Sequence, residues 1–304
     1  MKSIDLAGAW RLHRISTKES FPAVVPGDTH SALLAAGKIP DPYWGVNELE
    51  VQWVGREDWA YERSFDVDAS TLQEDRIHLS FESLDTIAEV FLNGKSVGSA
   101  DNMFVRWRFD AKRHLKLGKN TLTVVLASSE NSAAAAAKKL PYPFPHTQHP
   151  VQSPHRNLIR KVQCHGGWDW GPCLMVAGIP GGASLDAWSD VRIDYVYTEQ
   201  KHSKGRCVVR VFAECEAAHA GDYDLKVSVG ETTTSKKVRL ASGQPEREHR
   251  NACHLEEDRS AHPGPCEQGG QVRAFDDFPR ERAGCLLQGS QLDPARRPAP
   301  EGIP

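Results

Sequence analysis

The 304-residue sequence predicts an all-β protein built from antiparallel sandwiches. Three observations indicate this fold class. Short stretches with alternating apolar and polar residues recur along the chain as far as Leu240. Turn-forming residues separate these stretches at short intervals. After Glu246 the pattern is lost, so the predicted sandwiches all lie before that residue.

The clearest strand signals lie in the middle of the first domain. Arg76–Leu84 alternates apolar and polar side chains, which is typical of a half-buried strand. The Asn-Gly pair at residues 93–94 lies between two apolar stretches and predicts a type I′ hairpin, because both central residues of that turn need positive φ. Phe104–Asp110 also alternates, and Gly118–Asn120 predicts a turn before a strand at Leu122–Leu126.

Two short helices are expected among the strands. The first is His30–Gly37, with Asp28 or Thr29 as its N-cap and the final glycine as its C-cap. The second is the alanine-rich stretch Ser132–Leu140, which Pro141 ends because proline cannot continue a helix.

A long proline-rich loop is predicted after the second helix. The prolines of residues 141–155 disfavour helix in the residues before them and predict an extended or irregular chain. The stretch CHGGWDWGPC, Cys164–Cys173, follows in the same predicted loop, and long loops of this kind often carry function. Its two tryptophans, its aspartate and its glycines leave three interpretations open: a sugar site, a metal site or ordinary packing.

The boundaries of the predicted domains are 1–189, 190–245 and 246–304. The second domain contains four strand-like stretches: 191–200, 207–216, 223–230 and 236–240. An immunoglobulin-like sandwich needs about 100 residues, so we expect this one to be incomplete. The third segment is poor in aliphatic residues and cannot bury enough apolar surface to offset its ordering entropy, which predicts a disordered tail.

Charge and composition exclude several classes of partner. The chain has 37 basic and 40 acidic residues and no long basic run, so we expect neither nucleic acid nor membrane as a partner. The N-terminus shows no signal peptide, and no stretch has the roughly 18 apolar residues of a spanning helix. Seven scattered cysteines do not indicate a disulfide framework, which favours a cytoplasmic protein.

Four stretches of the chain stand out as a set: Val25–Glu48, Asp58–Val67, Glu82–Asp110 and His149–Pro172. They resemble the β-mannosidases of glycoside hydrolase family 2, densely up to about residue 190 and weakly to about residue 245. The resemblance implies a jelly-roll sugar-binding-type β-sandwich followed by immunoglobulin-like sandwiches. It also implies a catalytic (β/α)₈ barrel, but a barrel takes about 250 residues and this chain leaves no room for one.

The resemblance implies hydrolysis of terminal, non-reducing β-D-mannose residues with retention of configuration. The family's two catalytic glutamates lie on the barrel, so no catalytic residue is assigned in this chain, and the chain alone is expected to be inactive. The Trp-Asp-Trp-Gly motif implies that Trp168 and Asp169 contact the mannose and that Trp170 supports them. The implied partners are a β-mannoside oligosaccharide or glycan and the missing barrel domain; no cofactor is implied.

The tail also resembles the family in another reading frame. One choice of synonymous codons for residues 276–294, read one base later, gives MTFRVNGRAVSCKGANWIP, which is similar to the family's segment leading into the barrel. We hypothesise a one-base frameshift near residues 240–255 of a β-mannosidase gene, so that the chain is a truncated N-terminal portion. An alternative function is a non-catalytic carbohydrate-binding module, and a third is a regulatory fragment that pairs with the full-length enzyme.

Other candidate residues have simpler interpretations. Cys164 and Cys173 are too far apart for an ordinary zinc motif. Neighbouring zinc candidates are His146, His149, His155 and His165, with Cys253, His254, His262 and Cys266 in the tail. The polar side chains before the motif either line a sugar pocket or anchor the loop, and anchoring is favoured: Arg156, Asn157 and Arg160. Five tryptophans are predicted to pack in the sandwich core or between domains: Trp10, Trp44, Trp53, Trp59 and Trp107.

Overall fold

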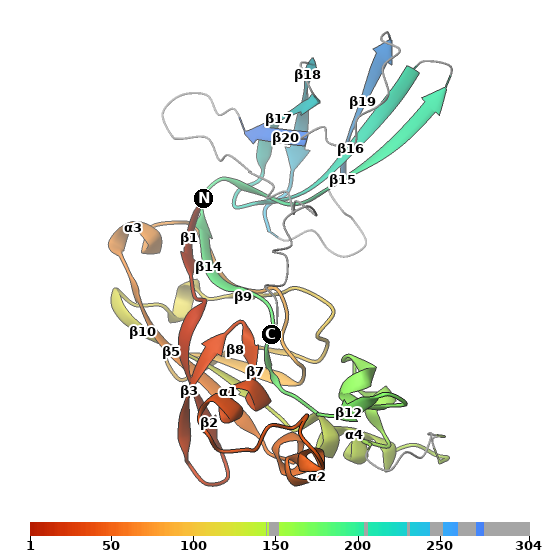
Figure 1. Ribbon diagram of the computed structural model, residues 1–304. Helices are drawn as coiled ribbons and strands as arrows, with labels where there is room; N and C mark the ends of the chain where they lie inside the picture. The colour runs from red at the N-terminus through yellow and green to blue at the C-terminus, as the bar shows by residue number, and fades with distance from the viewer. Residues whose placement is uncertain are drawn as a thin grey trace, which may run out of the picture. The chain divides into compact units, whose positions relative to one another are not determined.

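The computed structural model describes residues 1–143, 145, 152–203, 206–229, 232–243, 252–260 and 272–276. The chain forms two compact units, Met1–Trp188 and Ser189–Pro304 (Figure 1). The first boundary predicted from the sequence, after residue 189, lies one residue from this division. Among the described residues, none of the helices is long and apolar enough to span a membrane.

Two large antiparallel sheets form the core of the first unit, and its fold is the predicted all-β sandwich. The larger sheet has the strand order β3-β2-β5-β10-β7-β8 and the smaller has β1-β14-β6-β9. The strands are β1 (Lys2–Asp5), β2 (Gly8–Arg14), β3 (Ser20–Val25), β5 (Trp59–Val67), β6 (Arg76–Phe81), β7 (Ala88–Leu92), β8 (Lys95–Ala100), β9 (Trp107–Asp110), β10 (Gly118–Leu126) and β14 (Ala183–Trp188). One core cluster takes side chains from both sheets, including Leu12 and Val124 from the larger and Leu79 and Leu185 from the smaller.

The predicted hairpin turn is confirmed between β7 and β8. Asn93 has φ of 52° and Gly94 has φ of 76°, as a type I′ turn requires. The Asn93 amide also donates to the Asn120 side chain at 2.8 Å, so the turn is held from the neighbouring strand.

Gly94 provides a local test of this turn. A Cβ atom at this position meets nothing within 4 Å. The cost of Gly94→Ala is therefore only the free energy of holding alanine in the left-handed conformation. We expect the free energy of unfolding to fall by about 1–2 kcal/mol, measured by urea denaturation. A Gly37→Ala variant, at a similar φ of 63°, is the matched control and should lose a similar amount.

Three strands differ from the sequence prediction. In β6 the polar residues His78 and Ser80 are buried as well, and the Trp188 ring packs edge-on against His78 at 4.8 Å. β9 begins at Trp107, so the preceding residues of the predicted strand lie outside it. β10 already begins at Gly118, because Asn120 is buried and its side chain bonds back to the main chain of Lys116 and Gly118.

Short helices connect the strands of the first unit. The first is α1 (Thr29–Ala35), where the Asp28 side chain caps the N-terminus by accepting from the Ser31 backbone N–H. The second predicted helix, α4 (Ser129–Ala137), begins three residues earlier than expected, because Ser128 caps it. The remaining helices are α2 (Asn47–Glu50) and α3 (Ala69–Leu72), with 3₁₀ turns η1 (Gln52–Arg56), η2 (Lys112–His114), η3 (Arg156–Leu158) and η4 (Gln163–His165).

The predicted packing of five tryptophans holds for four of them. Trp10 and Trp59 are buried in the core, and Trp53 and Trp107 pack against it partly buried. Core packing does not hold for Trp44, which is 77% exposed in the loop before α2; packing between domains stays a prediction for this residue.

The second unit contains the four predicted strands in two sheets. They are β15 (Val191–Ser203), β16 (Arg206–Ala217), β17 (Gly221–Val229) and β18 (Thr232–Leu240). The sheet orders are β15-β16-β19 and β18-β17-β20, and a separate small core lies within this unit. Two stretches of the predicted disordered tail are strands, β19 (Ala252–Ser260) and β20 (Val272–Asp276), because they add as edges to β16 and β17. The rest of that segment lies outside the described residues.

Candidate functional site

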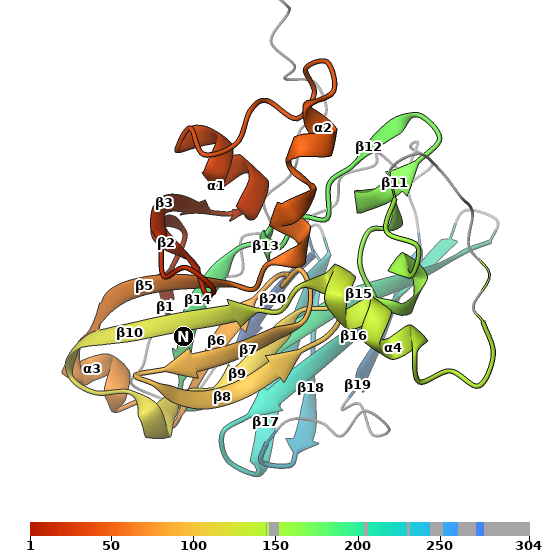
Figure 2. The same ribbon diagram turned by 90° about the horizontal axis from the view of Figure 1, so that it is seen from below.

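The CHGGWDWGPC stretch forms a small β-hairpin and not the loop that the sequence predicted. β11 (Gly166–Trp168) pairs antiparallel with β12 (Gly171–Cys173), and Trp168 lies opposite Gly171 (Figure 2). Asp169 and Trp170 therefore form the turn at the hairpin tip. Gly167, with φ of 98°, gives the first strand a conformation that residues with a side chain rarely adopt.

The aromatic side chains of the tip are exposed. Trp168 is 41% exposed and Trp170 is 83% exposed, so the packing interpretation does not hold for this pair. Their ring centroids lie 6.2 Å apart with the planes at 70°, an edge-to-face arrangement. The tip thus presents two exposed indole rings in contact with each other, one before and one after Asp169 in the chain.

Arg156 braces the first strand of the hairpin. Its guanidinium donates to the Gly166 carbonyl at 3.0 Å and lies 6.0 Å from the centroid of the Trp168 ring. A Cβ at Gly166 would come within 2.6 Å of the Arg156 side chain, so only glycine allows this approach. Arg160 also holds the segment, because its carbonyl accepts from the Met103 backbone N–H at 3.0 Å. The Arg156 contact agrees with the predicted anchoring role, whereas the Arg160 contact is made by its backbone; Asn157 lies in η3 between the two arginines.

The second strand of the hairpin is bound to the α2–η1 segment. The Cys173 backbone N–H donates to the Glu48 carboxylate at 2.6 Å, and the Gln52 amide donates to the Cys173 carbonyl at 2.7 Å. Figure 2 shows α2 beside β11 and β12. The loop before α2 carries Tyr43 and Trp44, both more than three-quarters exposed.

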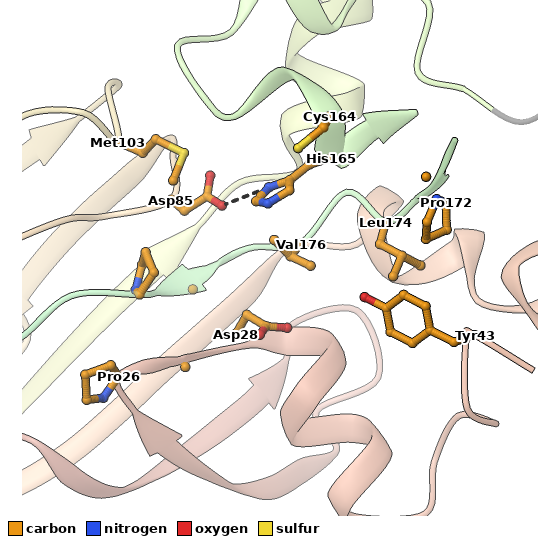
Figure 3. A pocket seen from close by; sticks show the side chains of 14 residues that line it. Pro26, Asp28, Tyr43, Asp85, Met103, Cys164, His165, Pro172, Leu174 and Val176 are labelled. Atoms are coloured by element: carbon orange, nitrogen blue, oxygen red, sulfur yellow. Dashed lines mark ion pairs between the residues drawn. The ribbon is translucent and has the colours of Figure 1, made fainter. Parts of the chain in front are cut away.

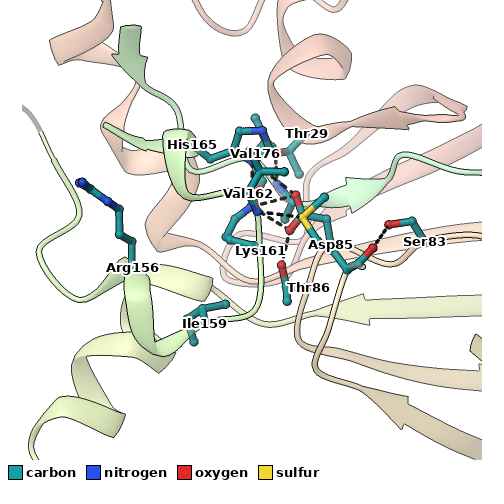
Figure 4. A network of polar contacts seen from close by, with 12 residues as sticks. Thr29, Ser83, Asp85, Thr86, Arg156, Ile159, Lys161, Val162, His165 and Val176 are labelled. Carbon is teal, nitrogen blue, oxygen red and sulfur yellow. Dashed lines mark hydrogen bonds and ion pairs between the residues drawn. The ribbon is translucent and has the colours of Figure 1, made fainter. Parts of the chain in front are cut away.

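A buried ionic cluster lies at the base of the hairpin, formed by Asp85, Thr86, Lys161 and His165 (Figure 4). The Lys161 ammonium donates to both carboxylate oxygens of Asp85 at 2.8 Å and to the Val176 carbonyl at 3.0 Å. It also lies 3.1 Å from Nδ1 of His165, and the Thr86 hydroxyl donates to Asp85. The lysine side chain is fully buried and that of Asp85 is 3% exposed.

Electrostatics in this cluster keep the histidine neutral. Burial lowers the pKa of His165, and the Lys161 ammonium lowers it further, against the opposing effect of Asp85. Because an ammonium only donates hydrogen bonds, Nδ1 of His165 is the acceptor and the ring proton is on Nε2. Burial also lowers the pKa of Lys161, and the Asp85 carboxylate opposes this shift.

A pocket of about 590 Å³ lies between the hairpin base and α1 (Figure 3). Asp28 and Tyr43 line it together with Asp85 and His165. The Asp85 Oδ2 atom lies 3.7 Å from Nδ1 of His165. The other lining residues are Pro26, Gly27, Met103, Cys164, Gly171, Pro172, Leu174, Val176, Gly178 and Pro180. The pocket reaches the short ladder between β4 (Gly27–Asp28) and β13 (Gly178–Ile179). The three predicted site residues at the hairpin tip are not among the lining residues.

The sequence pointed to Trp168, Asp169 and Trp170 as candidate site residues. It did not single out the ionic cluster or the pocket beneath the hairpin. The available sequence signal for this cluster was the family resemblance, because Asp85 and Lys161 lie in two of the stretches that carry it. No periodicity marks either residue as buried, because their partners are 76 positions apart in the chain.

The metal-site interpretation gains no support from the structure. Among the described residues, no group of three or more His, Cys, Asp or Glu side chains is placed to hold a metal ion. Burial raises the pKa of the Cys173 thiol to about 11, which disfavours the thiolate that zinc binds. Of the remaining candidates, four lie outside the described residues: His146, His149, His262 and Cys266.

Comparison with known proteins connects this geometry with a family. The family described as "Glycosyl hydrolase 2 galactose-binding domain-like" matches residues 10–181. The chain is 37% identical over 199 residues to a β-mannosidase of Capra hircus, covering 63% of this chain and 21% of that protein. It is 37% identical over 206 residues to β-mannosidase B of Neosartorya fischeri, covering 66% of this chain and 24% of that protein.

A solved structure agrees with these relatives. The crystal structure of β-D-mannosidase from Dictyoglomus thermophilum matches with a TM-score of 0.75 and 32% identity, over 85% of this chain and 31% of that one. The chain thus spans less than a third of the length of each of these three relatives. The sandwich of the first unit is the sugar-binding-like domain of these proteins, and the chain belongs to glycosyl hydrolase family 2, as the N-terminal part of a β-mannosidase-like protein.

Proposed function

We propose that this chain supplies the mannose-recognition part of the substrate cleft of a retaining β-mannosidase. The whole protein would remove terminal, non-reducing β-D-mannose residues from oligosaccharides or glycans. The observation that carries the proposal is the exposed Trp168–Trp170 tip on a hairpin that is fixed at both strands. A rigid, solvent-facing aromatic group is the form that sugar recognition needs.

The chemistry of the tip suits a neutral sugar. The Trp168 face covers the apolar C–H face of a pyranose ring, and the Asp169 carboxylate accepts hydrogen bonds from two hydroxyl groups. Trp170 meets the first indole edge-to-face and limits its movement. Retaining hydrolysis needs two carboxyls, the acid/base and the nucleophile, about 5 Å apart across the anomeric carbon. We assign neither of them to this chain. In the proposal both come from the barrel.

A chimera tests the contribution of the tip to activity. Residues 1–189 of this chain replace the matching part of the Dictyoglomus thermophilum enzyme, and hydrolysis of a p-nitrophenyl β-mannoside is measured. We expect Trp168→Ala and Asp169→Asn each to lower kcat/KM by roughly 10- to 100-fold, the effect of losing one stacking face or one charged hydrogen-bond acceptor. Trp44→Ala, an exposed tryptophan outside the tip, is the matched control. Equal activities of the tip variants and the control would contradict the proposal.

A non-catalytic carbohydrate-binding module is the second candidate, favoured by the self-contained first unit and its exposed aromatic tip. Calorimetric titration of the 304-residue chain with mannobiose separates the two candidates. A flat trace favours the fragment of an enzyme, since one part of a cleft holds a sugar weakly. Saturable binding that Trp168→Ala abolishes favours the module. The nucleotide sequence through codons 240–304 tests the frameshift, which requires a shifted frame that continues the family resemblance.

A further inference from the structure

One buried ammonium group joins both ends of the hairpin to the sandwich. Lys161 contacts His165, the residue immediately before β11, and the carbonyl of Val176, three residues after the end of β12. Its third partner is Asp85, which follows β6 of the smaller sheet. The three protons of the ammonium serve four acceptor atoms on these residues, so at least one proton is shared, and the group is shielded from water.

The Asp85 end of this connection is itself fixed. Its backbone N–H donates to the Gly178 carbonyl and its carbonyl accepts from the Gly178 N–H, both at 2.9 Å. The Thr86 hydroxyl donates to the carboxylate, which leaves the side chain little rotational freedom. A fixed carboxylate in the connection between β6 and β7 therefore determines where the ammonium lies, and the ammonium determines where the hairpin ends lie.

We infer that Lys161 is a positioning residue for the Trp168–Trp170 tip. Arg156 and Glu48 brace the individual strands, whereas Lys161 sets the distance between the two ends of the hairpin and the sheet. The effect of this residue on sugar recognition rests on the proposed function. The position of the hairpin itself does not.

A merely stabilising ion pair and a positioning residue predict different results. Removing a stabilising pair should make opening easier throughout the first unit. Removing a positioning residue should make opening easier in the hairpin before the rest of the unit. The double variant Lys161→Met/Asp85→Leu removes both charges together, so no unpaired buried charge remains. It also removes the contacts to His165 and Val176 and leaves the rest of the hairpin unchanged.

The experiment is hydrogen exchange of the 304-residue chain, read by mass spectrometry on peptides from 163–176 and from β5 and β10. In the double variant we expect the hairpin amides to exchange roughly tenfold faster, as when a local opening becomes easier, while β5 and β10 stay within about twofold of the unmodified chain. Unchanged hairpin exchange, or the same acceleration in the sheet, would overturn the inference.

A milder variant covers the case in which the double variant does not fold. His165→Gln leaves the Lys161–Asp85 pair intact and removes the histidine ring, so the hairpin peptides should exchange about threefold faster with an unchanged Tm. An unchanged rate in this variant also counts against the inference. In the chimera, the double variant should raise KM more than it lowers kcat. If Trp168→Ala leaves the chimera unaffected while hairpin exchange still rises, the proposed function fails and the positioning role stands.

Discussion

Replacing Lys161 by methionine is expected to lower the free energy of unfolding of the first unit by about 3–5 kcal/mol. Methionine fills a similar volume but carries no charge, so the Asp85 carboxylate, 3% exposed, would be left without its counter-charge. The carboxylate would then take up a proton or admit water, and either change weakens the folded state. Urea denaturation followed by tryptophan fluorescence measures the loss, because buried Trp59 reports on the core.

Two further variants make this result specific. Lys119→Met changes an exposed lysine on β10 and should shift stability by less than about 0.5 kcal/mol. Lys161→Met/Asp85→Leu should recover most of the single variant's loss, since a neutral pair has no buried charge to solvate. If Lys161→Met alone lowers the free energy of unfolding by less than about 1 kcal/mol, the Asp85 carboxylate does not depend on Lys161.

Acidification from pH 6.5 to pH 4 is expected to destabilise the first unit by about 3 kcal/mol through His30 alone. Burial lowers the pKa of this histidine to about 4, and the Lys161 ammonium and nearby His165 lower it further, whereas Asp28 opposes the shift. The folded state therefore binds fewer protons than the unfolded state in this range. Stability is highest above pH 6.5, where both states are neutral, and falls as the pH drops toward 4.

The variant His30→Leu isolates this contribution. Its free energy of unfolding, measured by urea denaturation at half-unit steps of pH, should decline less steeply between pH 6.5 and 4 than that of the unmodified chain. A residual decline is expected, because the lowered pKa of His165 acts with the same sign. His114→Gln, at a partly exposed position in η2, is the control for replacing a histidine. Parallel profiles for the unmodified chain and His30→Leu would contradict the assignment.

The sequence alone was sufficient for features that depend on local chemistry. The Asn93–Gly94 turn follows from the need for positive φ, and an N-cap at Asp28 or Thr29 follows from a side-chain oxygen beside free N–H groups; the structure identifies Asp28. Alternation and turn signals likewise predicted several strands of both units, although β6 is buried on both faces and not on one. The family resemblance indicated the importance of the Trp168–Trp170 motif, since that motif is a continuous stretch of sequence.

Only the tertiary structure decided features that depend on residues far apart in the chain. It converted the predicted loop into a hairpin, because Glu48 and Gln52 bind Cys173 from more than 120 positions away. It brought Asp85 to Lys161 and so placed a charged pair where the sequence shows no sign of burial. It also exposed Trp44, whose apolar character suggested the core. Composition and periodicity report what a residue prefers, whereas burial and ion pairing are set by what the folded chain places beside it.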